Sequence, residues 1–64
     1  MKFKPGDIVV WKGDYSAVCL ILNSYWKSKE YKVFVLSSSY KYRVGKTMTY
    51  YLEGGACLLN DKKL

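Results

Sequence analysis

The sequence contains no histidine, so it lacks the side chain that most often serves as a general base and as a metal ligand. Cys19 and Cys57 are its only cysteines, and two thiols without histidine cannot complete the usual four-ligand zinc site within one chain. Nucleophilic catalysis by either thiol would also need a base. The five carboxylates are scattered, and the chain has no glycine-rich phosphate-binding motif. We therefore predict no catalytic residues, no metal site and no cofactor.

Long hydrophobic runs are also missing. The longest covers residues 17–22 and is far too short to span a bilayer. The first residues lack the apolar block of a secretory signal, so we expect a cytoplasmic protein without a membrane partner. In a reducing compartment both cysteines are expected to be free, small, buried side chains, although neighbouring strands would let them oxidise after purification.

Acidic residues are scarce: eleven Lys and Arg face five Asp and Glu, which gives a net charge of +6. This sign favours nucleic acid or an acidic protein as partner, although lysines also serve solubility alone. The chain has 64 residues, half of them hydrophobic. That composition is typical of one globular domain, residues 1–64, near the lower size limit for an unaided core.

The residue pattern predicts an all-β fold. Runs rich in β-branched and aromatic residues alternate with polar, glycine-containing turns, and no segment has the apolar spacing of a stable helix. For so short a chain we expect a barrel, because closing the sheet removes exposed strand edges. The five predicted strands cover residues 7–12, 17–24, 31–36, 47–52 and 56–59. An edge-to-edge homodimer is also compatible with such a surface.

Three local expectations follow. Pro5 and Gly6 predict a turn, with the Asp7 carboxylate bonding amides just past it. The four apolar residues at positions 8–11 leave open which of them face the core. Residues 17–22 are expected to form a central strand that is buried on both faces. In the third strand, alternation places residues 31, 33 and 35 on one face and a partly wet Lys32 on the other.

The opening Lys-Pro-Gly-Asp-Ile-Val, residues 4–9, resembles the first strand of small SH3-like barrels, including KOW-type and Tudor-type modules. More narrowly, the order of features is similar to compact SH3-like proteins of tailed bacteriophages. A Leu-Ile-Leu strand (20–22), a Tyr-Lys-Val strand (31–33) and a short leucine-containing last strand carry this similarity. Many such barrels have a glycine in the second strand, where this chain has Cys19. The resemblance implies a binding fold without catalytic residues, and a host-cytoplasmic location for a phage-encoded chain.

The stretch from Tyr40 to Lys46 alternates aromatic and basic residues. In an extended ribbon, one side would present the tyrosines and the other the cations, a mixture typical of single-stranded nucleic-acid binding. The alternative is an ordinary ribbon whose tyrosines pack on the barrel while the charges stay solvated. The candidate binding residues are Tyr40, Lys41, Tyr42, Arg43 and Lys46.

A second aromatic and basic group lies in the loop between the second and third strands. Its candidate residues are Trp26, Lys27 and Lys29, with the alternative that Trp26 closes one end of the barrel. The resemblance to SH3-like folds implies that the two long loops converge into one site. We expect this site to bind nucleic acid, RNA or a single strand before duplex. The alternative is a protein-interaction module for an acidic host or virion protein.

Overall fold

The computed structural model describes residues 3–11, 16–52 and 54–59. It contains five antiparallel strands and one short 3₁₀ helix, η1. Their bounds are β1 Ile8–Trp11, β2 Ala17–Tyr25, β3 Glu30–Ser38, η1 Lys41–Arg43, β4 Thr47–Tyr50 and β5 Ala56–Leu58. The predicted all-β, five-stranded fold is confirmed.

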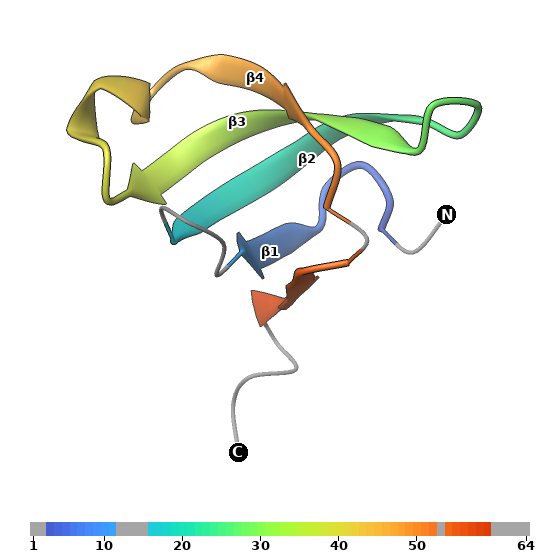
Figure 1. Cartoon of the computed structure of the whole chain (residues 1–64), viewed down its shortest axis with the longest axis horizontal. Coiled ribbons are helices and arrows are strands. Elements are labelled where there is room, and N and C mark those ends of the chain that lie inside the picture. The colour runs from blue at the N-terminus through green and yellow to red at the C-terminus, as the bar shows by residue number, and fades with distance from the viewer. Residues whose placement is uncertain (1–2, 12–15, 53, 60–64) are drawn as a thin grey trace.

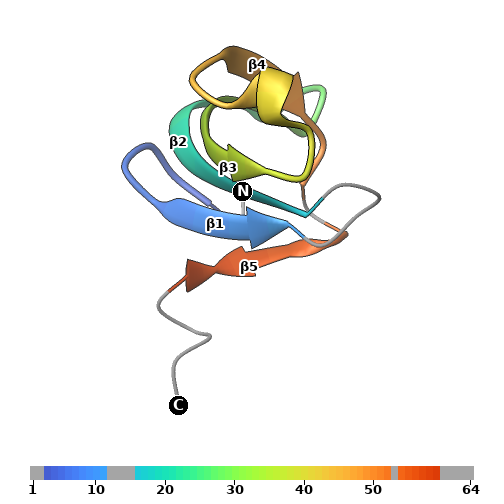
Figure 2. The ribbon, with the colours of Figure 1, turned by 90° about the vertical axis from the view of Figure 1, so that its left-hand side faces the viewer.

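The five strands form one sheet in the order β4-β3-β2-β1-β5. Figure 2 shows this sheet strongly curled, with β4 and β5 at its two edges. Among the described residues β4 and β5 do not pair with each other, so the barrel stays open rather than closed. This arrangement is consistent with a small SH3-like fold.

The turn before β1 forms as predicted. The Asp7 amide donates to the Lys4 carbonyl over 3.0 Å, and Gly6 has a φ of +96°, which glycine adopts without steric cost. The Asp7 carboxylate accepts from the Lys4 amide, 3.0 Å away, and thus bonds back across the turn rather than to an amide past it. Reciprocal backbone bonds with Ile21 then fix the turn against β2.

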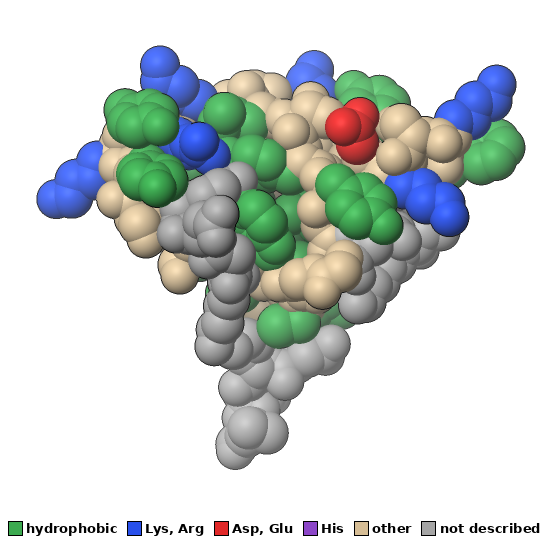
Figure 3. Space-filling view, in the orientation of Figure 1, with side chains coloured by type: hydrophobic (Ala, Val, Ile, Leu, Met, Phe, Trp, Pro, Cys, Tyr) green, Lys and Arg blue, Asp and Glu red, His purple; other side chains and the backbone are tan. Residues whose placement is uncertain are grey.

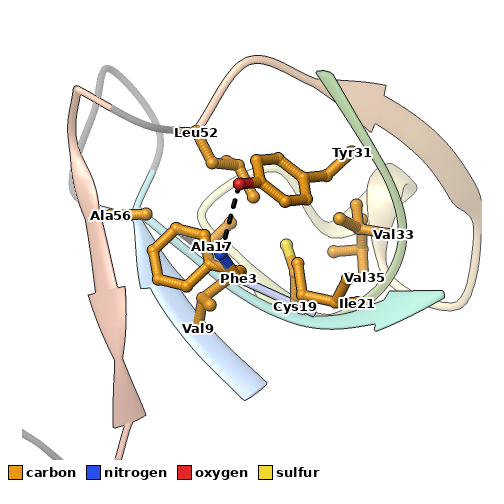
Figure 4. Packing of buried hydrophobic residues seen from close by; sticks show 10 residues of the cluster. All are labelled: Phe3, Val9, Ala17, Cys19, Ile21, Tyr31, Val33, Val35, Leu52 and Ala56. Carbon is orange, nitrogen blue, oxygen red and sulfur yellow. Dashed lines mark hydrogen bonds between the residues drawn. The ribbon is translucent and has the colours of Figure 1, made fainter. Parts of the chain in front are cut away.

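The core lies on the concave side of the sheet (Figure 4). Val9 is fully buried while Ile8 is exposed, which settles that the odd-numbered positions of β1 face the core. Residues 31, 33 and 35 are buried and Lys32 is exposed, as alternation predicted. The buried residues are Phe3, Val9, Ala17, Cys19, Ile21, Tyr31, Val33, Val35, Leu52 and Ala56.

Strand β2 is the central strand, as expected, but it is not buried on both faces. Ala17, Cys19 and Ile21 point into the core, whereas Leu22 on the other face is 40% exposed. Two register irregularities, at Val18/Cys19 and Ile21/Asn23, bend the strand as β-bulges do. No element of the described chain covers the convex face of β2, so its apolar residues there remain half-exposed.

The observed strand ends differ from the predicted ones mainly where pairing with a neighbouring strand extends a strand. β2 and β3 extend to Tyr25 and Glu30, which pair across the hairpin. The serines after Leu36, expected to end the third strand, continue β3 because Ser37 and Ser38 pair with Val18 and Ala17. β4 ends at Tyr50, two residues earlier than predicted, and Leu52 turns into the core. The predicted end of the first strand, residue 12, lies outside the described residues.

Candidate functional site

The segment after β3 does not form the extended ribbon that its alternating sequence predicts. Residues Lys41–Arg43 form the 3₁₀ helix η1, in which the Arg43 amide donates to the Tyr40 carbonyl over 2.9 Å. Successive residues of a 3₁₀ helix point about 120° apart, so the two-sided separation of tyrosines and cations is lost. Tyrosines and arginine therefore gather at one place instead of on opposite sides.

Tyr40, Tyr42 and Arg43 pack against one another. The two rings are stacked, with centroids 5.8 Å apart and planes 26° from parallel. The guanidinium carbon of Arg43 lies 5.1 Å from the Tyr40 centroid and 5.6 Å from that of Tyr42. These distances fit cation–π contacts. Tyr42 nevertheless keeps 66% of its surface exposed, and Tyr40 keeps 41%.

Arg43 also connects this group to the sheet. Its Nη1 donates to the hydroxyl of Tyr50 on β4 over 3.2 Å, and that hydroxyl donates to the sulfur of Met48 over 3.0 Å. The Tyr50 ring stacks on Trp11 at the end of β1, with centroids 5.7 Å apart. Hydrogen bonds to Tyr42 and Tyr50 raise the pKa of Arg43 above its ordinary value, so the guanidinium is always charged.

Sequence reasoning missed Trp11 and Tyr50 as supports of the site. Tyr50 lies seven residues from Arg43 in the chain, and Trp11 belongs to a strand that is not a neighbour of β4. Only the curvature of the sheet brings these side chains together. The composition of the fourth strand, rich in threonine and tyrosine, identified it as a strand but carried no signal for this contact.

The two lysines of the predicted site, Lys41 and Lys46, are both exposed. From residue 31 to residue 52 the sequence contains four cations and no carboxylate. The segment that contains η1 therefore carries positive charge only. We call the group of Tyr40, Lys41, Tyr42, Arg43 and Lys46 the aromatic-basic cluster.

The loop between β2 and β3 is a tight turn at the end of a long hairpin, formed by residues 26–29. The Lys29 amide donates to the Tyr25 carbonyl over 2.7 Å, and Lys29 itself adopts a left-handed φ of +60°. Trp26 is 70% exposed, so it does not close an end of the barrel. A hollow of about 300 Å³ lies among residues 24–28. We call residues 25–29 the hairpin tip.

The aromatic-basic cluster and the hairpin tip do not converge. Figure 1 places η1 at one end of the longest axis and the β2–β3 hairpin tip at the other. Figure 3 shows hydrophobic side chains interleaved with Lys and Arg at both ends of this face. The expectation of one merged site, implied by the SH3-like resemblance, is therefore wrong for this chain. The predicted residues form two separate groups.

The two cysteines are free, as expected. Cys19 is fully buried, and burial raises the pKa of its thiol to about 11. Cys57 is only half-buried, so the expectation of burial is wrong for this thiol. It pairs with Val10, whereas Cys19 pairs with Val9 on the other side of β1. A whole strand thus separates the thiols, and they point to opposite faces of the sheet, a placement that excludes a disulfide between them.

Within the described ranges, no three His, Cys, Asp or Glu side chains are grouped as a metal site would need. The same residues contain no helix of the length and apolarity that crossing a membrane requires. Comparison of the chain with protein-family models, curated proteins and solved structures gives no match. Function must therefore be argued from the site itself.

Proposed function

We propose that this protein binds single-stranded nucleic acid, RNA or DNA, through the aromatic-basic cluster and performs no chemistry. The observation that carries the proposal is the stacked pair Tyr40 and Tyr42, held by Arg43 and flanked by two exposed lysines. Exposed aromatic rings beside cations are the common means of holding unpaired bases and their phosphates.

The roles divide between rings and cations. The exposed ring of Tyr42 offers a surface on which a base stacks, and Lys41 and Lys46 neutralise the neighbouring phosphates. Arg43 fixes the rings, because its guanidinium already packs on them and bonds Tyr50. Stacking contributes about 1–3 kcal/mol per base, so this cluster alone supports a weak site. Duplex is disfavoured because its bases already stack on one another.

The test is a titration of fluorescein-labelled single strands, followed by anisotropy at about 50 mM and about 200 mM salt. Two lysine–phosphate contacts give a slope of log K on log salt of about −1.4, so the higher salt should weaken binding about sevenfold. The double change Lys41→Glu with Lys46→Glu should abolish binding. The matched control, Lys4→Glu with Lys32→Glu, changes the net charge equally at two exposed positions outside the cluster and should retain most of it. No binding by the wild type at low salt would contradict the proposal.

A second candidate function, binding an acidic protein, is favoured by the net charge of +6 together with the apolar convex face of the sheet. Ile8, Leu20 and Phe34 are register partners there and form one apolar row across β1, β2 and β3. Leu22 and Leu36 add side chains that are 40% and 42% exposed. Antiparallel sheets more often turn a polar face to water. A nuclease-treated pull-down that recovers a stoichiometric acidic protein, lost on Leu36→Asp, would support this function over the first.

We also propose that the chain is related to the SH3-like proteins of tailed phages and acts in the cytoplasm of the host. The Pro-Gly turn that leads into β1 and the order of the five strands support this relationship. An experimental structure whose strand connections differed from those of SH3-like barrels would contradict it.

A further inference from the structure

The hairpin tip presents an aromatic side chain to solvent on a hydrogen-bonded turn. Besides the bond from the Lys29 amide, the Ser28 hydroxyl donates to the Tyr25 carbonyl over 3.4 Å. Trp26 is 70% exposed and Tyr25 is 40% exposed. Large aromatic rings on a fixed turn bury apolar area in a complex at a small cost in conformational entropy. The tip is therefore arranged for contact with a partner.

The charge of the tip suits the same partner as the aromatic-basic cluster. Lys27 and Lys29 are exposed, and the neighbouring carboxylate, Glu30, is half-buried at the base of the hairpin. Aromatic rings beside ammonium groups thus occur at both ends of one face, where Figure 3 shows the two kinds of side chain together. Two chemically similar groups on one molecule point to a ligand that repeats, and a polynucleotide repeats base and phosphate.

The ring of Tyr51 is also exposed and lies nearer the hairpin tip than the aromatic-basic cluster does. The register pairs Tyr50 with Tyr31, one residue from the start of β3, so the chain leaves β4 at the hairpin end of the sheet. Tyr51 follows directly and is 58% exposed. The sequence predicts a fourth strand over residues 47–52, and Tyr51 is not among the predicted binding residues.

We infer that the hairpin tip is a second contact for the strand held by the aromatic-basic cluster, so that one single strand spans the long axis of the protein. This inference rests on the proposed function and adds the length of the ligand. The long axis measures 29 Å. A strand with stacked bases advances about 3.4 Å per nucleotide, so about nine nucleotides reach from end to end, and an extended strand needs fewer.

The consequence is that binding affinity should rise with strand length more steeply than the number of possible binding positions on the strand does. A strand too short to reach both groups binds one of them weakly. Once the strand reaches both groups, the second contact forms within the complex, at a high effective concentration. The affinity then rises by a much larger factor than the strand length does.

The experiment compares oligo(dT) of four and of twelve nucleotides at low salt, with the whole chain and two variants. The first variant, Trp26→Ala with Lys27→Ser, removes the tip contacts on exposed positions. The second, Leu59→Ala, is a control that removes a 43% exposed apolar side chain just past the end of β5. Thermal unfolding of each variant checks that the fold is kept.

We expect the wild type and the control to bind the twelve-nucleotide strand at least 30-fold more tightly than the four-nucleotide strand. The tip variant should lose at least tenfold in affinity for the long strand and keep its affinity for the short one. Unchanged binding of the long strand by the tip variant would overturn the inference and leave the proposed function standing. An equal loss for both lengths would also overturn it, because the tip would then be the primary site. Failure of the wild type to bind either strand would instead refute the proposed function.

Discussion

The guanidinium of Arg43 donates to the hydroxyl of Tyr50 over 3.2 Å and thereby joins η1 to β4. The same guanidinium packs on the rings of Tyr40 and Tyr42. The only arginine of the chain is thus a positioning residue, which holds the tyrosines in place. In the proposed complex the exposed Lys41 and Lys46 contact the phosphates.

This division of roles predicts different salt dependences for two variants. Arg43→Lys keeps the charge but loses the planar group that stacks and bonds Tyr50, so single-strand affinity should fall about three- to tenfold with the salt slope unchanged. Lys41→Ala removes a phosphate contact and should reduce the slope by about 0.7. Binding isotherms at four salt concentrations measure both. A reduced slope for Arg43→Lys would show that Arg43 contacts phosphate itself.

Two adjacent glycines should respond in opposite ways to substitution by alanine. A Cβ on Gly55 would lie 2.7 Å from Nε1 of Trp11, and Trp11 cannot move without disturbing its stack on Tyr50. Gly55→Ala should therefore destabilise the fold by about 1–3 kcal/mol. Gly54→Ala meets no atom within 4 Å and should be neutral or slightly stabilising. Urea unfolding of both variants tests this, and equal stabilities would contradict the packing around Trp11.

The docking of Phe3 in the core should depend on the buried hydroxyl of Tyr31. The Phe3 amide donates to the Tyr31 hydroxyl over 3.2 Å, and their rings lie 5.6 Å apart in the core (Figure 4). Tyr31→Phe leaves that buried amide without its acceptor and should cost about 1–3 kcal/mol of unfolding free energy. Tyr51→Phe, at a 58% exposed position, is the control and should cost little. A neutral Tyr31→Phe would mean that Phe3 does not dock as described.

The two thiols should differ sharply in reactivity. Burial raises the pKa of Cys19 to about 11, so at pH 8 only about one thiol in a thousand is ionised, and the side chain is inaccessible as well. Half-buried Cys57 should react first with a thiol reagent in the native protein, and Cys19 only on unfolding. Mass spectrometry after a short pulse of iodoacetamide identifies the modified residue. An intramolecular disulfide under mild oxidation would contradict the sheet order.

The Cys19 thiol also makes stability depend on alkaline pH. Its folded-state pKa is raised from 9.0 to about 11, so the protonated form is favoured in the folded state. The stabilisation is complete below pH 9 and is lost as the pH rises from 9 through 11, by about 3 kcal/mol in all. Cys19→Ala should show a shallower decline of unfolding free energy between pH 9 and 11. Parallel curves for the two proteins would contradict the burial of this thiol.

The sequence predicted the strands well because each strand signal is local. Pro5 and Gly6 marked the turn, and alternation in residues 31–36 placed the buried face of β3 correctly. Prediction from the sequence is wrong where contacts between residues far apart in the chain determine the local structure. Nothing near Arg43 in the sequence reveals that Tyr50 receives its hydrogen bond, so the sequence predicts a ribbon over residues 40–46 where the structure has η1.

The prediction that β2 is buried on its convex face is also wrong because burial depends on distant parts of the chain. The apolar run at residues 17–22 predicted burial on both sides, yet no described element of this short chain covers the outer face. The separation of the two candidate sites was likewise invisible, because loop placement depends on the lengths of β2 and β3. Those lengths follow from pairing across the hairpin and not from the local composition.

The most direct test of nucleic-acid binding is an amide NMR titration of the ¹⁵N-labelled protein with a twelve-nucleotide single strand at low salt. We expect the largest shift changes in residues 40–46, with a second group in residues 25–29 and little change along the convex face. No change at any residue, or changes confined to Ile8, Leu20, Leu22, Phe34 and Leu36, would contradict the proposed site.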